Sequence, residues 1–486
     1  MRPSASAVNA AEPHPAWRDL LGSGAVVGLG LAVEVVSQFA RTLILARLLG
    51  ASEFGLVASV NTLYAVVDMV SFIGIDRYII FSPQGGDPEA LGAAHNLSLL
   101  RGVVSAALIL ALALPTAALV GARDHASGFS VLAIVPLLRG ATHLGIIRIQ
   151  RSGCFWPAAA AEAFGSLAGL IATVAAALLT RDFTALLWGL GIQAAVAVLL
   201  SHVLSFGTAY RCSFSSGHFR AALSFGLPLM GNGLALAAAF QLDRMVIGAW
   251  LGVVELGIYG LSMAIIVQPI SLLMRLANTA WQPRLSAAWH QDKSGLFPSL
   301  VAHIGRFGAA LGAAGAAIAV CIGSPFVQLA FGDGYFASDT FFFIMASVIL
   351  ARLCRGALNL LGLAIGRTSD LMLSNLAGAI ALPATIAAFF IHPRIESAAL
   401  GGLIGEILSC VALTVLLRPY CAAPAIALIR DFAKATIVPF LSGATVLLTA
   451  PDLRLRVAVA VAGLLVCLGT TVLNRNTSGA TKRPTC

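Results

Sequence analysis

The chain reads RLLGASEFG over Arg47–Gly55 and AWLGVVELG over Ala249–Gly257. When the second stretch is laid on the first, at an offset of about 202 residues, a leucine, two glycines and a glutamate coincide. Each stretch follows one long apolar segment and precedes another. The repetition predicts that the chain contains one structural unit twice, with this stretch between the first and second helices of each copy.

The composition is that of a membrane protein. Of the 486 residues, 59% are hydrophobic and 10% are charged, which is too little charge to cover the surface of a soluble protein of this length. Apolar runs of membrane-spanning length recur from end to end. The net charge of +9 is spread thinly and follows the positive-inside bias, so we expect no nucleic-acid partner.

Hydropathy predicts an all-α polytopic protein of about 14 transmembrane helices. We expect an N-terminal six-helix lobe over residues 1–206, a cytoplasmic linker over 207–221, a second six-helix lobe over 222–420, and two accessory helices with a cytoplasmic tail over 421–486. The expected spans are about 20–43, 54–75, 93–120, 128–149, 155–179, 183–206, 222–249, 256–279, 298–329, 339–364, 369–391, 397–417, 433–450 and 455–473.

The arginines and lysines favour an orientation with both termini in the cytoplasm. Because each lobe has an even number of helices, the two copies share one orientation, and parallel repeats of this kind build transporters that rock about a central site. The shared glycines suit tight turns. Glu53 and Glu255 are placed to cap the positive N-terminus of the helix that follows.

Charged side chains within the spans are the candidate functional residues, because charge is costly in a membrane. Arg139, Arg352 and Arg355 fall near the middle of spans, and we expect them to face a central water-filled cavity. Near span ends the alternative to a binding role is snorkelling to a headgroup. The arginines in that position are Arg41, Arg244 and Arg275.

The acidic candidates have two interpretations. Glu34, Asp68 and Glu406 could couple transport to Na⁺ or H⁺, or they could neutralise neighbouring arginines, which we slightly favour for Glu34 and Glu406. Arginines outnumber carboxylates within the spans. This excess favours an anionic cargo, especially a phosphate, whose oxygens match the guanidinium fork.

Motifs for other chemistry are missing. The sequence contains no phosphate loop, no zinc-protease motif and no serine nucleophile elbow. The eight cysteines form no CxxC or His-paired cluster, so we expect no cofactor, no metal and no enzyme activity.

Four stretches resemble a known family. RLLGASEFGLVASV after the first span, DRMVIGAWLGVVELGIYGLSMAI (Asp243–Ile265), WQPRLSA (Trp281–Ala287) and FVQLAFGDGYFASD (Phe326–Asp339) are similar, in order and spacing, to signatures of the polysaccharide transporter family. That family holds the Wzx-like oligosaccharide flippases of the multidrug/oligosaccharidyl-lipid/polysaccharide exporter superfamily.

The resemblance implies a flippase of the bacterial inner membrane. It implies two six-helix lobes around a V-shaped cavity, and a cargo of oligosaccharide repeat units linked to an undecaprenyl-type pyrophosphate. Alternating access would deliver that cargo for exopolysaccharide or O-antigen (lipopolysaccharide) synthesis. Membrane lipids, and the polymerase and chain-length proteins of the pathway, are the partners it suggests.

Other functions stay open at this point. A cation-coupled multidrug exporter and a lipid II flippase share the superfamily, although arginine-rich spans count against a carrier of cationic drugs. An integral-membrane glycosyltransferase would need a catalytic group on a large loop, and the loops here are short.

Overall fold

The computed structural model describes residues 17–205, 215–290, 295–449 and 452–478, and all regular structure in these ranges is helical. The α-helices are α1 (Trp17–Val70), α2 (Ile75–Phe81), α3 (Pro88–Leu119), α4 (Ala126–Val131), α5 (Ile134–Gly140), α6 (Gly145–Arg151), α7 (Trp156–Thr180), α8 (Thr184–Val203), α9 (Ser216–Phe240), α10 (Leu242–Leu251), α11 (Val253–His290), α12 (Leu296–Phe331), α13 (Asp339–Ala364), α14 (Thr368–Gly378), α15 (Ala381–Ile391), α16 (Ile395–Ala435), α17 (Ile437–Thr449) and α18 (Leu453–Ser478). Two 3₁₀ turns, η1 (Arg123–His125) and η2 (Asp333–Tyr335), join them.

Ten helical stretches of the described chain are long and apolar enough to cross a membrane, or eleven when a bent pair counts as one span. Two of the ten, Val26–Phe81 and Ile395–Thr449, have 56 and 55 residues, and each is long enough for two crossings. The backbone leaves helical geometry inside them at Gly50 and at Cys421. With α18 added, this division is consistent with about 14 spans.

One expected span differs from a straight helix. The stretch predicted as 128–149 is a pair of helical segments, Arg123–Gly140 and Gly145–Arg151, bent by 53° at the residues between them. Gly140 lies directly before the bend, where the backbone of α5 packs on α3 at Gly102. α9 begins at Ser216, earlier than the predicted start at residue 222, while residues 206–214 of the expected linker lie outside the described chain.

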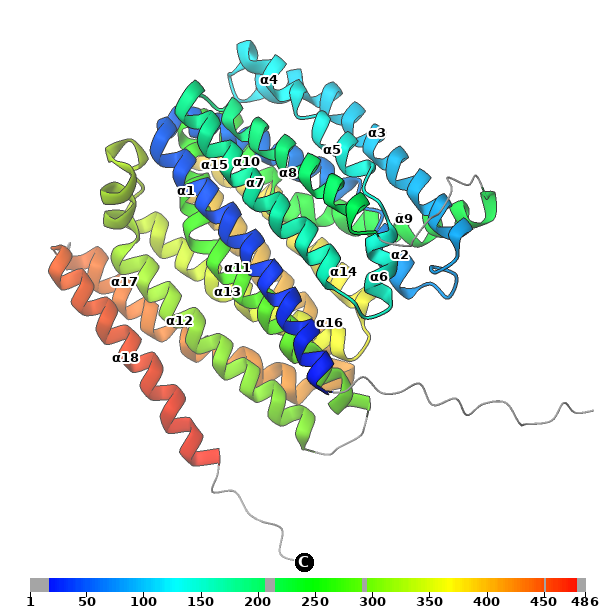
Figure 1. Ribbon diagram of the computed structural model, residues 1–486. Coiled ribbons are helices and arrows are strands. Elements are labelled where there is room, and N and C mark those ends of the chain that lie inside the picture. The colour runs from blue at the N-terminus through cyan, green and yellow to red at the C-terminus, as the bar shows by residue number, and fades with distance from the viewer. Residues whose placement is uncertain (1–16, 206–214, 291–294, 450–451, 479–486) are drawn as a thin grey trace, which may run out of the picture.

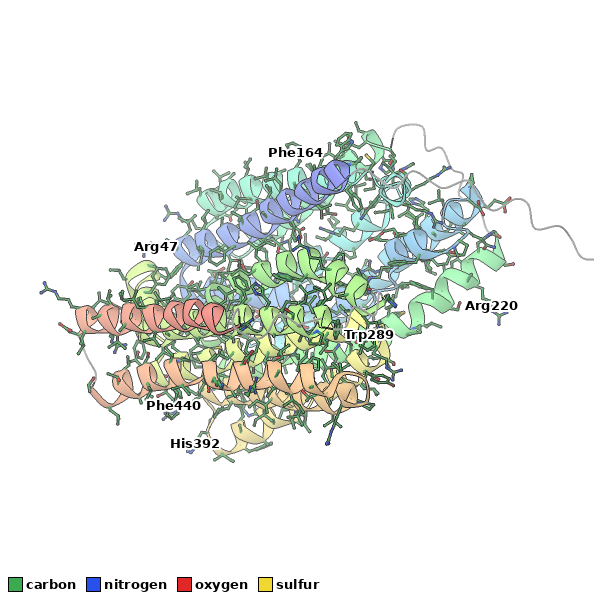
Figure 2. All side chains as sticks on the ribbon, turned by 90° about the horizontal axis from the view of Figure 1, so that it is seen from below. Arg47, Phe164, Arg220, Trp289, His392 and Phe440 are labelled. Atoms are coloured by element: carbon green, nitrogen blue, oxygen red, sulfur yellow. The ribbon has the colours of Figure 1, made fainter. Side chains whose placement is uncertain are left out.

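The outside of the bundle is apolar. Leu179 and Leu329 are 85% and 81% exposed, and other large apolar side chains share this position. Figure 2 shows two of them, Phe164 and Phe440, at the periphery of the helices. Such a surface would aggregate in water but matches a hydrocarbon solvent.

The two lobes meet where α1 and α11 lie side by side (Figure 1). Gly50 and Gly252 have nearly the same backbone, with φ 79°, ψ 172° and φ 91°, ψ −179°, a conformation essentially restricted to glycine. A Cβ atom on Gly55 would lie 1.8 Å from the carbonyl oxygen of Val253. One on Gly257 would lie 2.4 Å from that of Ala51. The repeated sequence therefore forms the crossing between the lobes.

Further contacts tie η2 to α1. The Tyr335 hydroxyl donates a hydrogen bond of 2.9 Å to the carbonyl oxygen of Ala46, and its ring packs edge-on against Phe54 at 6.1 Å between centroids. Burial raises the pKa of the Tyr335 phenol above its ordinary value, so the hydroxyl remains a donor.

Glu53 does not cap its own following helix: Oε2 accepts from the backbone N–H of Phe183, at the N-terminus of α8, at 2.9 Å.

The last two helices pack on the second lobe. α18, red in Figure 1, lies along α12 at the edge of the bundle. Arg456 near its start forms a bidentate ion pair with Asp339 at the start of α13, with N···O distances of 2.7 and 2.8 Å. This pair holds one end of the accessory helix to the second lobe.

Candidate functional site

A cavity of about 160 Å³ lies between the lobes, walled by α1, α8, α10 and α11. We call it the inter-lobe cavity. Among the described residues, the charged side chains that line it are Arg41 and Arg244, and the other polar ones, Gln38, Thr42, Asn61 and Gln268, are uncharged. The described lining of the inter-lobe cavity is therefore positively charged and contains no carboxylate.

The two arginines come from opposite lobes. Arg41 is 9% exposed and donates through Nη1 to Oε1 of Gln193 at 3.0 Å, so an amide holds it without cancelling its charge. Nε of Arg244 has no hydrogen-bond partner among the described residues. Gln268 likewise has a buried, unpartnered Oε1 atom. Unpaired polar atoms are costly when buried, so the second lobe contributes two side chains with unused hydrogen-bonding capacity to this region.

The neighbouring carboxylate of Asp243 is already occupied. Its Oδ2 atom accepts from the Tyr259 hydroxyl at 2.7 Å, and its Oδ1 atom accepts from the backbone N–H of Arg244 at 2.9 Å. Asp243 is only 6% exposed. It therefore fixes the start of α10, and Arg244 lines the cavity without an ion pair to any described carboxylate.

A second polar cavity, of about 410 Å³, lies within the first lobe and is lined by α1, α2, α3, α5, α6 and α7. We call it the N-lobe cavity. Arg101 pairs there with Asp68 at 2.6 Å, and Arg139 with Glu162 at 3.8 Å. Asp76 also lines it and forms no ion pair within the described chain. With three carboxylates and two guanidiniums, the N-lobe cavity has the opposite charge bias to the inter-lobe cavity.

Two more of the predicted arginines, Arg352 and Arg355, form a closed cluster with Glu406 in the second lobe. Nε of Arg352 and Nε of Arg355 each lie 2.6 Å from a different oxygen of Glu406, whose side chain is 2% exposed. The two guanidiniums also lie over the ring of Phe240, at 5.1 and 4.7 Å. Arg355 reaches Oδ1 of Asn375 at 3.4 Å. These arginines neutralise a buried acid at the same time as they point into the bundle.

The predicted site residues thus fall into three places rather than one vestibule. Arg41 and Arg244 share the inter-lobe cavity, Arg139 and Asp68 line the N-lobe cavity, and Arg352, Arg355 and Glu406 form the triad. Glu34 accepts from Nε2 of Gln38 at 3.1 Å on α1. The side chain of Arg275 lies outside the described residues.

Two residues of these sites carried little signal in the sequence. Gln193 is a lone amide in an apolar run, and only the packing of α7, α8 and α1 brings it to Arg41. Asp76 falls just beyond an expected span end, where a carboxylate usually faces water. Asp76 is exposed, and it lines the cavity because α2 packs against α3, α6 and α9.

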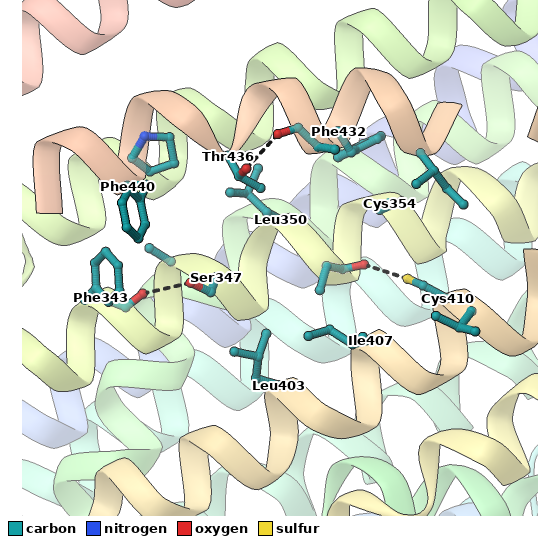
Figure 3. Close-up of a pocket in the computed structure, with 16 residues that line it drawn as sticks. Phe343, Ser347, Leu350, Cys354, Leu403, Ile407, Cys410, Phe432, Thr436 and Phe440 are labelled. Carbon is teal, nitrogen blue, oxygen red and sulfur yellow. Dashed lines mark hydrogen bonds between the residues drawn. The ribbon is translucent and has the colours of Figure 1, made fainter. Parts of the chain in front are cut away.

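A third pocket is apolar and separate from these charges. It has a volume of about 460 Å³ and lies between α13, α16 and α17. Figure 3 shows the rings of Phe343 and Phe440 at one end and Cys410 at the other, where the thiol donates to the carbonyl oxygen of Ala351 at 3.3 Å. Its lining has no charged residue, so it offers nothing to hold a phosphate.

The chain is similar in sequence to a known protein family and to two proteins of polysaccharide biosynthesis. The profile of the family described as "Polysaccharide biosynthesis protein" matches residues 44–339, more than half of the chain. The amylovoran biosynthesis protein AmsL of Erwinia amylovora is 26% identical over 241 residues, which are 49% of this chain and 60% of that protein. The succinoglycan biosynthesis transport protein ExoT of Rhizobium meliloti (strain 1021) is 26% identical over 223 residues, 46% of this chain and 44% of that protein.

The matches therefore span about half of this chain and about half of each relative. Among solved structures, the lipid II flippase MurJ in an inward closed conformation superposes with a TM-score of 0.72 at 13% identity, covering 93% of this chain and 99% of that one. An inward-facing MATE multidrug resistance transporter of the MOP superfamily gives 0.65 at 14% identity, covering 85% and 96%. The all-helical fold predicted from the sequence is confirmed by these likenesses.

Proposed function

The chain belongs to the polysaccharide biosynthesis protein family, and from this premise we propose that it is a flippase for lipid-linked oligosaccharides. The cargo is a repeat unit carried on an undecaprenyl-type pyrophosphate. It crosses the bacterial inner membrane by alternating access, for exopolysaccharide or O-antigen synthesis. In this proposal the protein is a transporter and not an enzyme, both termini are cytoplasmic, and the polymerase and chain-length proteins receive its product.

The observation that carries the proposal is the charge of the inter-lobe cavity. Arg41 from the first lobe and Arg244 from the second line it together, and no carboxylate is among its described lining residues. A pyrophosphate entering a low-dielectric bundle needs fixed positive charge in place of its water. Because the two arginines belong to different lobes, a bound phosphate would also connect the parts that move in a rocking mechanism.

The charge of the inter-lobe cavity also bears on the alternative functions. A carrier of cationic drugs would be repelled by two uncancelled guanidiniums. A lipid II flippase uses the same pyrophosphate chemistry and differs in the sugars attached, so the phosphate site alone does not distinguish it. Coupling to Na⁺ or H⁺ would fall to Glu34 or to Asp68, whose single ion pair with Arg101 is half-exposed, since Glu406 is buried between two arginines.

Binding of undecaprenyl pyrophosphate to the purified protein in lipid nanodiscs tests the proposal, with undecaprenol as the uncharged control. We expect Arg41→Gln and Arg244→Gln each to weaken binding about tenfold or more, the loss typical of a charged hydrogen bond. Arg47→Gln is the matched control, because Arg47 is an exposed arginine on the same helix and at the edge of the bundle in Figure 2. The site would be refuted if undecaprenol bound as tightly as undecaprenyl pyrophosphate, or if both cavity variants kept the wild-type affinity for undecaprenyl pyrophosphate.

A further inference from the structure

We propose that the N-lobe cavity is a carbohydrate subsite that accepts neutral sugars of the cargo and rejects acidic ones. The inference rests on the proposed function for its place in transport, but the site itself is argued from the residues that line it. Its volume of about 410 Å³ falls in the range of roughly 300–1,000 Å³ that is usual for small-molecule sites.

The lining offers donors and acceptors together. Arg101 and Arg139 supply N–H donors, three carboxylates supply acceptors, and the lining also contains the hydroxyls of Ser98 and Thr142. A sugar hydroxyl donates one hydrogen bond and accepts others, so it is best satisfied by a wall of mixed character. A phosphate only accepts, and it would meet three repelling carboxylates here.

Asp76 is the acceptor that the protein leaves available. The other two carboxylates already face guanidiniums, at 2.6 Å for Asp68 and 3.8 Å for Glu162. Asp76 lines the same cavity with no hydrogen bond or ion pair to its side chain in the described chain. Among the residues that line the cavity, the carboxylates exceed the guanidiniums by one, and we expect this lining to disfavour a further negative charge such as a uronate.

The aromatic residues of the cavity add an apolar surface. Tyr64 and Phe72 both line it. The guanidinium of Arg101 already lies over the Phe72 ring, 5.8 Å from its centroid, which leaves Tyr64 as the ring available to the C–H face of a sugar. A tyrosine suits this role because it combines an apolar body with a polar hydroxyl.

The position of the cavity matches the layout of a lipid-linked sugar. Asn61 lines the inter-lobe cavity, while Tyr64 and Asp68 line the N-lobe cavity. Their spacing places all three on one face of the second half of α1, and about 10 Å of helix separates the first from the last. A pyrophosphate between Arg41 and Arg244 would have its sugars directed along this face.

A cation site is the main competing use of three carboxylates. In the part of the chain that the structure describes, however, no three acidic, histidine or cysteine side chains converge closely enough to hold a metal ion. The arginines that separate the carboxylates also oppose a bound cation.

Two soluble disaccharides test the inference in full-length protein in nanodiscs: cellobiose, and its analogue with a glucuronate in place of one glucose. Saturation-transfer NMR and calorimetry measure each affinity. We expect wild type to bind cellobiose at least about fivefold more tightly than the glucuronate analogue, and Asp76→Ala to weaken cellobiose binding about tenfold. Asp76→Asn with Glu162→Gln should remove the discrimination. Asp124→Ala, at an exposed acid in η1, is the control.

Undecaprenyl pyrophosphate binding reports folding and tests the proposed function separately. If the wild-type protein binds cellobiose but not undecaprenyl pyrophosphate, the carbohydrate subsite is supported and the flippase proposal is refuted. No cellobiose binding by wild type, equal or tighter binding of the glucuronate analogue, or unchanged cellobiose binding in Asp76→Ala would overturn the subsite. If Asp76→Ala fails to bind undecaprenyl pyrophosphate and is therefore misfolded, the double variant Asp76→Asn with Glu162→Gln tests the subsite instead.

Discussion

Glu406 shows how a single residue decides what its neighbours can do. Its carboxylate is 2% exposed and holds two guanidiniums at 2.6 Å, so Arg352 and Arg355 share one negative charge. The ring of Phe240 lies beneath both. A buried charge costs several kcal/mol unless it is paired. The triad is therefore a packing element of the second lobe as much as a candidate ligand of the cargo.

Removing the acid should be more damaging than removing the whole cluster. We expect Glu406→Ala to destabilise the protein by about 3–5 kcal/mol, because it leaves two buried guanidiniums without a carboxylate. The thermal unfolding midpoint in detergent should fall accordingly. Glu89→Ala, at an exposed acid in the first turn of α3, should melt like wild type.

A compensated variant separates this account from simple loss of packing. Glu406→Leu combined with Arg352→Leu and Arg355→Met removes all three charges, and it should recover much of the lost stability. If Glu406→Ala itself melts with wild type, the triad contributes nothing and the interpretation is wrong.

At the scale of helices, the repeated stretch has two structural roles: it ends one helix, and it allows two helices to pack closely. Gly50 and Gly252 break the chain between helices with backbone that other residues rarely adopt. Gly55 and Gly257 follow at a fixed spacing and let α1 and α11 approach to backbone contact. The sequence predicted the turn, since glycine at a span end is a familiar signal. It did not predict the crossing, because which helices meet depends on the packing of both lobes.

Gly257→Val should separate the two helices at this crossing. The added carbons would overlap the carbonyl oxygen of Ala51 and the backbone of Gly55, and overpacking of this kind costs about 1–3 kcal/mol. Thermal unfolding measures the loss. Gly28→Val is the control, because a Cβ on Gly28 meets no atom within 4 Å; equal midpoints for the two variants would show that the crossing is not tight.

Local periodicity explains which parts of the site were predictable. Gln38 and Arg41, and likewise Tyr64 and Asp68, recur at helical spacing, and each pair lies in or near one cavity as the spacing suggests. Contacts across the sequence were not predictable. Arg352 meets Glu406 from 54 residues away, and Arg41 meets Gln193 from 152, because those pairings are set by helix packing rather than by any local pattern.

At the scale of the whole molecule, the arginines differ in whether a carboxylate pairs with them. The arginines of the described spans discussed above mostly have carboxylate partners within their own lobe, whereas Arg41 and Arg244 line the space between lobes without one. Among these arginines, the two without a carboxylate partner in the described chain therefore lie where the lobes meet. In the proposed mechanism this places the pyrophosphate on the boundary that opens and closes, and the sugars beside it in the first lobe.

The leaflet position of the lipid-linked oligosaccharide in cells lacking the protein tests the central claim most directly. Spheroplasts are treated with a membrane-impermeant reagent that oxidises exposed sugars, and the protected fraction is extracted and measured. The account predicts that the oligosaccharide accumulates in the protected, cytoplasmic leaflet, and that wild type or Arg47→Gln restores its exposure whereas Arg41→Gln with Arg244→Gln does not. Full exposure of the oligosaccharide without the protein, or full rescue by the double variant, would contradict it.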